Sequence, residues 1–255
     1  MDFSSYTPER LQGFKARYIQ RSATLSLGTV RDFCDSMDQM AELATIQQDL
    51  KDLQRPWAFK AVLANVPTGG RILEIGAGEP YVAELLSRCG YEVWVVDPYD
   101  GSGNGPTEFA EFVGRYPNLK IIRQQFGTGL SQLPLASFDA VYSISVLEHI
   151  PFDALRDAMA MAHQCLAPRG INIHAVDHVH LGRGRDYHLR MLELICTEVD
   201  LPVSALHAIL DTVDRDQEVY LLSAEAHNRW RGAQPYDNFP MRRCISVQLV
   251  VPNVG

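Results

Sequence analysis

The chain has 255 residues, with 23 basic and 31 acidic side chains and a formal net charge of −8. This length allows one large domain, or a core domain with an added cap. Phosphate binding depends on clustered Lys and Arg, so we expect no nucleic-acid partner. Five dispersed cysteines without a Cys-x-x-Cys pair, and the lack of a leader-like or membrane-spanning apolar run, predict a cytoplasmic protein without membrane contact.

Residues 8–66 predict helices throughout. Amphipathic spacing extends over 8–23, 29–53 and 55–66, and Pro56 is placed to open the third helix. We expect residues 1–66 to form a helical cap or lid.

The remaining residues, 67–255, predict a domain in which strands alternate with helices. Apolar, β-branched runs predict strands at 71–78, 91–97, 119–125, 138–145, 171–177, 218–223 and 244–251. Helical spacing separates most of these runs, which predicts an α/β fold with a doubly wound parallel sheet. The stretch 224–243 is too long for a tight hairpin, so we expect it to be an insertion near the last strand.

Residues 71–80, RILEIGAGEP, form a predicted buried strand that runs into a turn containing Gly76 and Gly78. A nicotinamide or flavin fingerprint has a third glycine three residues after the second, but Tyr81 stands there. A phosphate loop has Gly-Lys-Ser/Thr after its glycines, and the chain lacks this as well. Both kinds of nucleotide site are therefore disfavoured.

Four segments in the expected order resemble class I S-adenosylmethionine-dependent methyltransferases. Glu74, Gly76 and Gly78 resemble the family's first motif, acid-x-Gly-x-Gly-x-Gly, with Pro80 at the last glycine. Asp97 ends the second strand, where the family carries a ribose-binding acid. The other two segments are FDAVYSISVLEHIP (138–151) and LAPRGINIHAVD (166–177). The resemblance implies a mostly parallel seven-stranded, Rossmann-like methyltransferase fold, an antiparallel last strand at 244–251, and S-adenosyl-L-methionine as the cofactor.

The same resemblance implies how the cofactor is held. Asp97 would accept hydrogen bonds from both ribose hydroxyls, with a helix cap or turn role as the alternative. Glu74 would take the cationic amino group or organise the loop. Gln125, Phe126 and Pro98 are candidates for the adenine contacts. The predicted cofactor-binding residues are Glu74, Gly76, Ala77, Gly78, Asp97, Pro98, Gln125, Phe126 and Ser145.

Histidines supply the candidates for catalysis. Methyl transfer from a sulfonium is an in-line displacement, and a base is needed only where the acceptor must lose a proton. Past Asp177 we expect a loop at the carboxyl end of the sheet, with His178 as general base and Asp177 orienting it or binding substrate. A hydrogen-bonded loop cluster is the alternative. His149 borders the expected acceptor site, and no metal is assigned because Glu148, His149 and a downstream histidine fall one ligand short.

The flanking segments should select the acceptor, which we expect to be a small molecule or a glycan intermediate. Segment 224–243 carries Trp230, Arg231 and Tyr236, which suit a pocket for a sugar-like or carboxylate-bearing acceptor. Exposed aromatics in the N-terminal helices would suit a homodimer. Two other functions stay open: a lyase or cyclase that uses the same cofactor, and a catalytically silent cofactor-binding protein.

Overall fold

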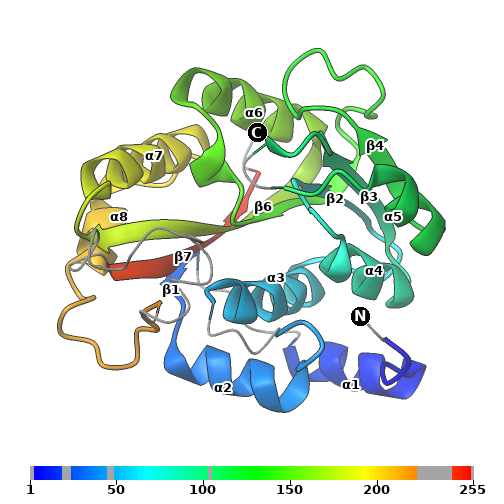
Figure 1. The fold of residues 1–255 in the computed structure, drawn as a ribbon, viewed down its shortest axis with the longest axis horizontal. Coiled ribbons are helices and arrows are strands. Elements are labelled where there is room, and N and C mark those ends of the chain that lie inside the picture. Colours follow the sequence, from blue (N-terminus) through cyan, green and yellow to red (C-terminus); the bar gives the residue numbers. More distant parts are fainter. Residues whose placement is uncertain (1–2, 19–23, 45–48, 103–104, 223–242, 254–255) are drawn as a thin grey trace.

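The structure, a computed structural model, describes residues 3–18, 24–44, 49–102, 105–222 and 243–253. Within these ranges one central sheet carries helices on both faces (Figure 1). None of the described helices is long and apolar enough to cross a membrane. All five cysteines lie in the described ranges, and none forms a disulfide bond.

The described part of the sheet has seven strands in the order β1-β7-β6-β5-β2-β3-β4. The strands are β1 (Leu25–Leu27), β2 (Arg71–Ile75), β3 (Glu92–Asp97), β4 (Lys120–Arg123), β5 (Phe138–Ile144), β6 (Leu166–Leu181) and β7 (Arg243–Pro252). Neighbouring strands from β6 to β4 are parallel, whereas β7 is antiparallel to both β6 and β1. The predicted doubly wound, mostly parallel α/β sheet is confirmed.

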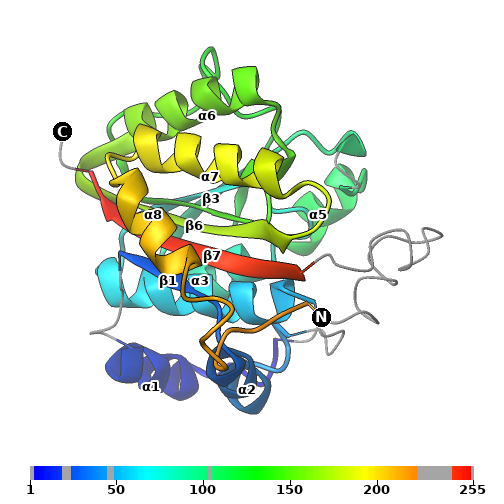
Figure 2. The ribbon, with the colours of Figure 1, turned by 90° about the vertical axis from the view of Figure 1, so that its left-hand side faces the viewer.

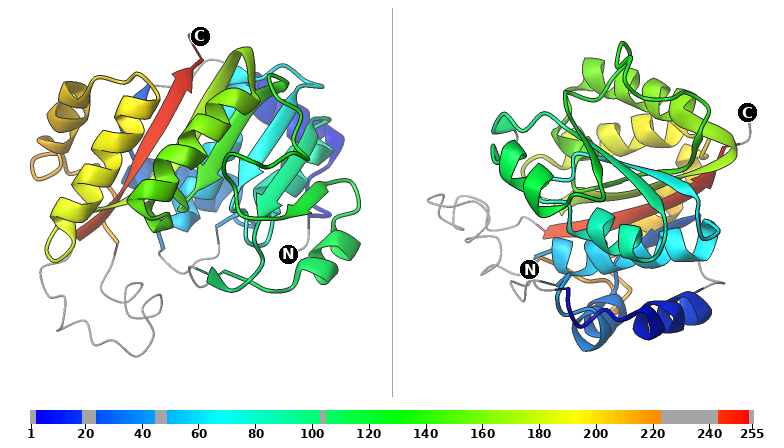
Figure 3. Two further views of the ribbon diagram at one scale, coloured as in Figure 1. Left: turned by 90° about the horizontal axis from the view of Figure 1, so that it is seen from above. Right: turned by 90° about the vertical axis from the view of Figure 1, so that its right-hand side faces the viewer.

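Helices form layers on the two faces of the sheet. They are α1 (Pro8–Tyr18), α2 (Val30–Gln39), α3 (Lys51–Asn65), α4 (Tyr81–Arg88), α5 (Phe109–Arg115), α6 (Phe152–Cys165), α7 (Arg185–Glu198) and α8 (Val203–Leu210), with a 3-10 turn η2 (Leu147–His149). Helices α3 and α4 cover one face, and α1 and α2 lie outside them (Figures 1 and 2). On the other face α6 and α7 lie side by side, next to α8 (Figure 3).

The central strands are apolar because both of their faces are covered. On β2, Ile72 packs among residues of α3 and α4, whereas Leu73 packs among residues of α6, and both side chains are 0 % exposed. Burying one such side chain stabilises the fold by about 1.5–3 kcal/mol. The largely apolar run at 72–75, interrupted only by Glu74, and the apolar run at 93–96 are the consequence.

The prediction that residues 8–66 are helical throughout is wrong. Residues 25–27 form β1, which pairs with β7 through Leu25↔Leu249 and Leu27↔Val247. The Leu27 side chain packs into the core on the face of the sheet that α7 covers. On the opposite face, the Ser26 hydroxyl donates to Gln248 Oε1 at 3.0 Å. The N-terminal segment therefore contributes a strand to the sheet as well as a helical layer.

Two helix boundaries also differ from prediction. The expected single helix over 29–53 is wrong, because α2 ends at Gln39 and α3 begins at Lys51. Pro56 lies inside α3 rather than at its start. A capping box begins α2: Thr29 Oγ1 accepts from the Asp32 amide, and the Asp32 carboxylate accepts from the Thr29 amide.

The last two differences concern β6 and the segment 218–223. A strand was predicted over 171–177 with a loop after it, but β6 continues to Leu181. This extension is stable because β7 pairs with it as far as Leu181↔Arg243, which satisfies backbone groups that a loop would leave to water. The strand predicted at 218–223 is absent, since within the described residues that stretch makes one isolated bridge, Thr29↔Val219.

Candidate functional site

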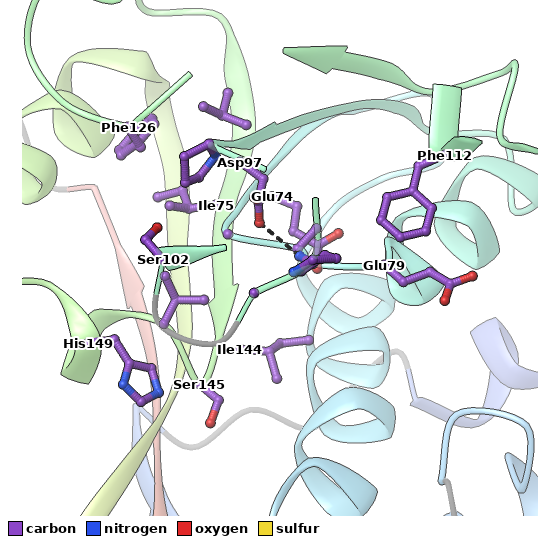
Figure 4. Close-up of a pocket in the computed structure, with 18 of the residues that line it drawn as sticks. Glu74, Ile75, Glu79, Asp97, Ser102, Phe112, Phe126, Ile144, Ser145 and His149 are labelled. Carbon is purple, nitrogen blue, oxygen red and sulfur yellow. Dashed lines mark hydrogen bonds between the residues drawn. The ribbon is translucent and has the colours of Figure 1, made fainter. Parts of the chain in front are cut away.

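A cavity of about 1080 Å³ opens at the carboxyl ends of β2, β3 and β5. Its wall also includes residues of α3, α5 and the segments that follow β3 and β5. Figure 4 shows labelled side chains from several of these elements turned toward the cavity. This edge of a parallel sheet is where α/β folds bind their ligands.

The glycine turn after β2 forms one wall. Gly76 has φ +65° and Gly78 has φ +58°, a region in which glycine carries no steric cost. A Cβ atom at Gly76 would lie 2.6 Å from Cγ1 of Val146, so the turn and the end of β5 approach too closely for any side chain. At Gly78 the nearest atom to an added Cβ is Cδ of Pro106, at 3.6 Å. Gly78 therefore leaves space that the cavity uses.

Asp97 connects this turn to the end of β3. Its Oδ2 accepts from the Gly78 amide at 2.9 Å (Figure 4). Its Oδ1 accepts from the Tyr99 amide at 2.8 Å. Burial raises its pKa, and the two amide donors oppose that shift. Tyr99 itself has φ +47°, a conformation that is costly outside glycine. Each carboxylate oxygen keeps a further lone pair for a ligand.

Glu74 lies under the turn. Its side chain is 4 % exposed, and its Oε2 has no hydrogen-bond partner among the described residues. Burial raises the pKa of Glu74 to about 8, while the Tyr142 hydroxyl and, less strongly, the positive charge of Arg55 act in the opposite direction. Arg55 belongs to α3, lines the cavity and lies over the Tyr81 ring at 5.3 Å from its centroid. The Glu74 carboxyl group and the Arg55 guanidinium, from distant segments of the chain, thus line the same cavity.

All of the residues predicted to bind the cofactor line this cavity: Glu74, Gly76, Ala77, Gly78, Asp97, Pro98, Gln125, Phe126 and Ser145. Phe126 is buried and packs into the core, whereas Gln125 is exposed. Ser145 follows β5 with φ +55°. Their roles toward a ligand stay predictions.

The three predicted catalytic residues separate. His149 lines the cavity beside Ser145 (Figure 4). Asp177 and His178 do not line the cavity. Both belong to the extended strand β6, and their side chains point to opposite faces of the sheet because side chains alternate along a strand. Asp177 faces α3, where its Oδ1 accepts from Gln54 Nε2 at 2.8 Å.

His178 lies on the other face of β6, close to α7. Its ring centroid is 6.4 Å from that of His188 and 6.3 Å from that of His180. Burial lowers the pKa of His178 to about 3, and the positive charges of His188, His180 and Arg185 add to this effect. The prediction that His178 lies in a loop is wrong, because it belongs to β6. Its ring lies close to α7 and does not line the cavity, so His178 is poorly placed to act as the base.

Sequence reasoning missed several wall residues, chiefly Asp49, Lys51, Arg55, Glu79 and Arg115. Three of them precede or belong to α3, a helix that was read only as part of a cap. The cluster of charged residues at the start of α3 was the available signal.

Two further expectations concern the insertion at 224–243 and a metal site. Residues 224–242 of the expected insertion, with Trp230, Arg231 and Tyr236, lie outside the described residues. Among the residues that the structure does describe, no group of three or more His, Cys, Asp or Glu side chains could hold a metal ion.

Comparisons with known proteins agree with this geometry. A family profile described as a methyltransferase domain matches residues 50–237. Ubiquinone biosynthesis O-methyltransferase from Nitrosococcus oceani is 32 % identical over 103 residues, which is 40 % of this chain and 41 % of that protein. Protein-L-isoaspartate O-methyltransferase from Gloeobacter violaceus is 29 % identical over 114 residues, 44 % of this chain and 53 % of that protein. The chain thus matches about half the length of these relatives.

Solved structures show more distant similarity. A TehB-like methyltransferase from Corynebacterium glutamicum is 19 % identical, with a TM-score of 0.45 over 65 % of this chain and 83 % of its own. The 1,6-didemethyltoxoflavin-N1-methyltransferase from Burkholderia thailandensis is 16 % identical, with a TM-score of 0.48 over 97 % of this chain and 92 % of its own.

Proposed function

The chain belongs to the family of S-adenosylmethionine-dependent methyltransferase domains, and from this premise we propose that it transfers a methyl group from S-adenosylmethionine to a small-molecule or glycan acceptor. One observation carries the proposal. The glycine turn, Asp97 and Glu74 meet in one cavity that continues past these residues to His149, Ile150 and Pro151. A cofactor and a second molecule therefore both have a place.

The residues present suit this cofactor. Gly78 leaves room beside Pro106 where a side chain would intrude, and the buried Oε2 of Glu74 lacks a partner within the described structure. A buried polar atom without a partner is costly, so a ligand that donates a hydrogen bond there would be stabilised. The cofactor's amino group is such a donor.

Each part of the cofactor has a candidate partner. Asp97 would accept hydrogen bonds from the ribose hydroxyls through its remaining lone pairs. Glu74 would take the amino group, and Arg55 would take the carboxylate through its planar guanidinium. Pro98 and Phe126 would lie against the adenine ring, with Gln125 at its edge.

The bound cofactor would supply a methyl group that its sulfonium charge already activates for in-line displacement. The chain's own contribution is to position the acceptor and to exclude water. Val146, Ile150 and Pro151 give the acceptor side an apolar wall. Among the described histidines, His149 alone lines the cavity, so it is placed to take a proton from a hydroxyl acceptor.

Incubation with S-adenosylmethionine labelled on the methyl group, together with a panel of amine, hydroxyl and sugar acceptors, tests the proposal. We expect label in an acceptor and an equal amount of S-adenosylhomocysteine. Cofactor breakdown to another adenosyl product would instead indicate a lyase or cyclase. Tight cofactor binding without turnover on any acceptor would indicate a silent binding protein.

A further inference from the structure

Carboxylates gather at the end of the cavity that lies beyond the cofactor residues. Asp49, which lines the cavity, precedes α3, Glu148 belongs to η2, and Asp177 belongs to β6. Glu148 and Asp177 are each 5 % exposed, and Glu148 Oε1 accepts from the Asp177 amide at 3.1 Å. Three elements that are far apart in sequence therefore bring acids to one place.

The acids are close enough to influence one another. Burial first and the Asp177 charge second raise the pKa of Glu148, to about 8, and of Asp49. Asp52, which is 0 % exposed, adds a further carboxylate near Asp49. The cavity-lining cations on this side are Lys51 and Arg55, both on α3. The site thus holds more acids than bases.

A second observation points to a ligand. The Ser145 hydroxyl lines the cavity and belongs to a side chain only 5 % exposed. It interacts with the Glu148 carboxyl group beside it, but no partner lies at full hydrogen-bond distance and angle in the described structure. Two more buried oxygens, Glu148 Oε2 and Gln54 Oε1, also lack partners in the described structure, although neither residue lines the cavity. All three can accept a hydrogen bond. A ligand in the cavity can reach the Ser145 oxygen, and a donor there leaves the Ser145 proton free for the Glu148 carboxyl group beside it.

Neither the start of α3 nor a metal ion accounts for this cluster. The positive N-terminal end of α3 stabilises the charges of Asp49 and Asp52, which flank its start. It does not explain why Glu148, Asp177 and the Ser145 hydroxyl lie at the same place. A metal ion would need a ligand set that the described residues do not provide. An organic cation fits better, because an ammonium group has three donors and no acceptor.

We propose that the acceptor carries a positively charged nitrogen, as an amine or guanidine, next to an apolar body. Asp49 and Ser145 are its direct partners, Asp177 supplies negative potential behind them, and Val146, Ile150 and Pro151 hold the apolar part. This inference rests on the proposed function, since it names the acceptor class of the same cavity.

Binding of small aromatic probes to protein saturated with S-adenosylhomocysteine tests the inference. Benzylammonium, benzyl alcohol and benzoate share a shape and differ in charge. We expect benzylammonium to bind about 10-fold more tightly than benzyl alcohol, with benzoate weakest, in ligand-detected NMR at neutral pH. Equal binding of the alcohol, or no binding of benzylammonium, would overturn the inference even with the wild-type protein alone.

Variants locate the effect. Asp49→Asn, Ser145→Ala and Asp177→Asn should each reduce the preference for benzylammonium to about 3-fold or less, whereas Glu84→Gln should keep it. Glu84 is a matched control because it is 6 % exposed but does not line the cavity. Full preference in both aspartate variants would contradict the assignment. Failure to bind S-adenosylhomocysteine is a separate result, which would overturn the proposed function itself.

Discussion

The two ends of the cavity are built in different ways. At the cofactor end, polar contacts come from two strand tips and the backbone beside them: Asp97 holds the amides of Gly78 and Tyr99. At the acceptor end, side chains from a pre-helical segment, a 3-10 turn and β6 meet, and several of their oxygens lack partners in the described structure. Asp97 holds the first end together without a ligand, and Glu74 Oε2 is the acceptor left without a partner there, whereas the second end leaves several such oxygens.

This difference between the two ends separates contacts that local sequence determines from contacts that depend on long-range packing. A turn and the strand next to it are fixed by residues close in sequence and by one parallel register, such as Ile75↔Val96. Contacts between Asp177 and Gln54 depend on how α3 packs on the sheet, 123 residues away in sequence. The cofactor end should therefore be sensitive to backbone changes and the acceptor end to side-chain charge.

The largest effect should follow from Gly76→Ala. The added methyl would lie 2.6 Å from Val146 Cγ1 at a φ of +65°, so the turn must move. We expect the affinity for S-adenosylhomocysteine, measured by calorimetry, to fall at least about 100-fold. Gly129→Ala is the control, because Gly129 has φ +96° but no heavy atom within 4 Å of an added Cβ, and it does not line the cavity. Equal affinities of the two variants would show that the turn does not touch the cofactor.

Arg55→Gln should give the next largest effect. If the guanidinium receives the cofactor's carboxylate, its loss removes a charge-assisted contact and should weaken S-adenosylhomocysteine binding about 10- to 100-fold. Binding of 5′-methylthioadenosine, which has no carboxylate, should stay nearly unchanged. Lys51→Gln is the matched control on the same helix. A larger loss with Lys51→Gln would assign the carboxylate to Lys51 instead.

Glu74→Gln should change how stability depends on pH. The folded protein keeps a proton on Glu74 up to about pH 8, whereas the unfolded chain loses it near 4.5. Raising the pH from 5 to 8 therefore favours unfolding, and the wild-type protein should lose on the order of 2 kcal/mol more than the variant in urea titrations. Glu92→Gln is the control, because Lys120 lowers the pKa of Glu92 to about 2 and nothing changes between pH 5 and 8. Parallel pH curves for wild type and Glu74→Gln would show that Glu74 is ionised.

The smallest effect should come from His178→Asn. Its ring lies on the α7 side of β6 and does not line the cavity, so kcat/KM should stay within about 3-fold of wild type. His149→Asn, at the cavity wall, is the comparison and should lower the rate with a hydroxyl acceptor about 10-fold or more. A strong loss in His178→Asn alone would restore His178 as the base.

The sequence predicted the sheet, and it selected cofactor candidates that lie together at one cavity. The buried strands are continuous apolar runs, and the glycine turn, Asp97 and the segment after β5 are local patterns whose spacing is read directly. All the residues predicted to bind the cofactor line the cavity for this reason.

The errors have physical causes. Strand β1 has three residues, too few for an alternating pattern, and it forms only because β7 offers an edge more than 200 residues later. The end of β6 was read as a loop because histidines interrupt its apolar run, although Val179 is buried in regular alternation with His178 on the opposite face. Asp49 and Arg55 reach the cavity only through the packing of α3, which helical spacing alone does not reveal.

Calorimetric titration of Asp97→Asn with S-adenosylhomocysteine tests the central claim most directly. Asp100→Asn is the matched control, since Asp100 lines the same cavity but is exposed and accepts from the Ser102 amide. The account predicts binding to wild type, a loss of about 30-fold or more in Asp97→Asn, and little change in Asp100→Asn. Absence of binding to the wild-type protein, or equal affinities of the two variants, would contradict it.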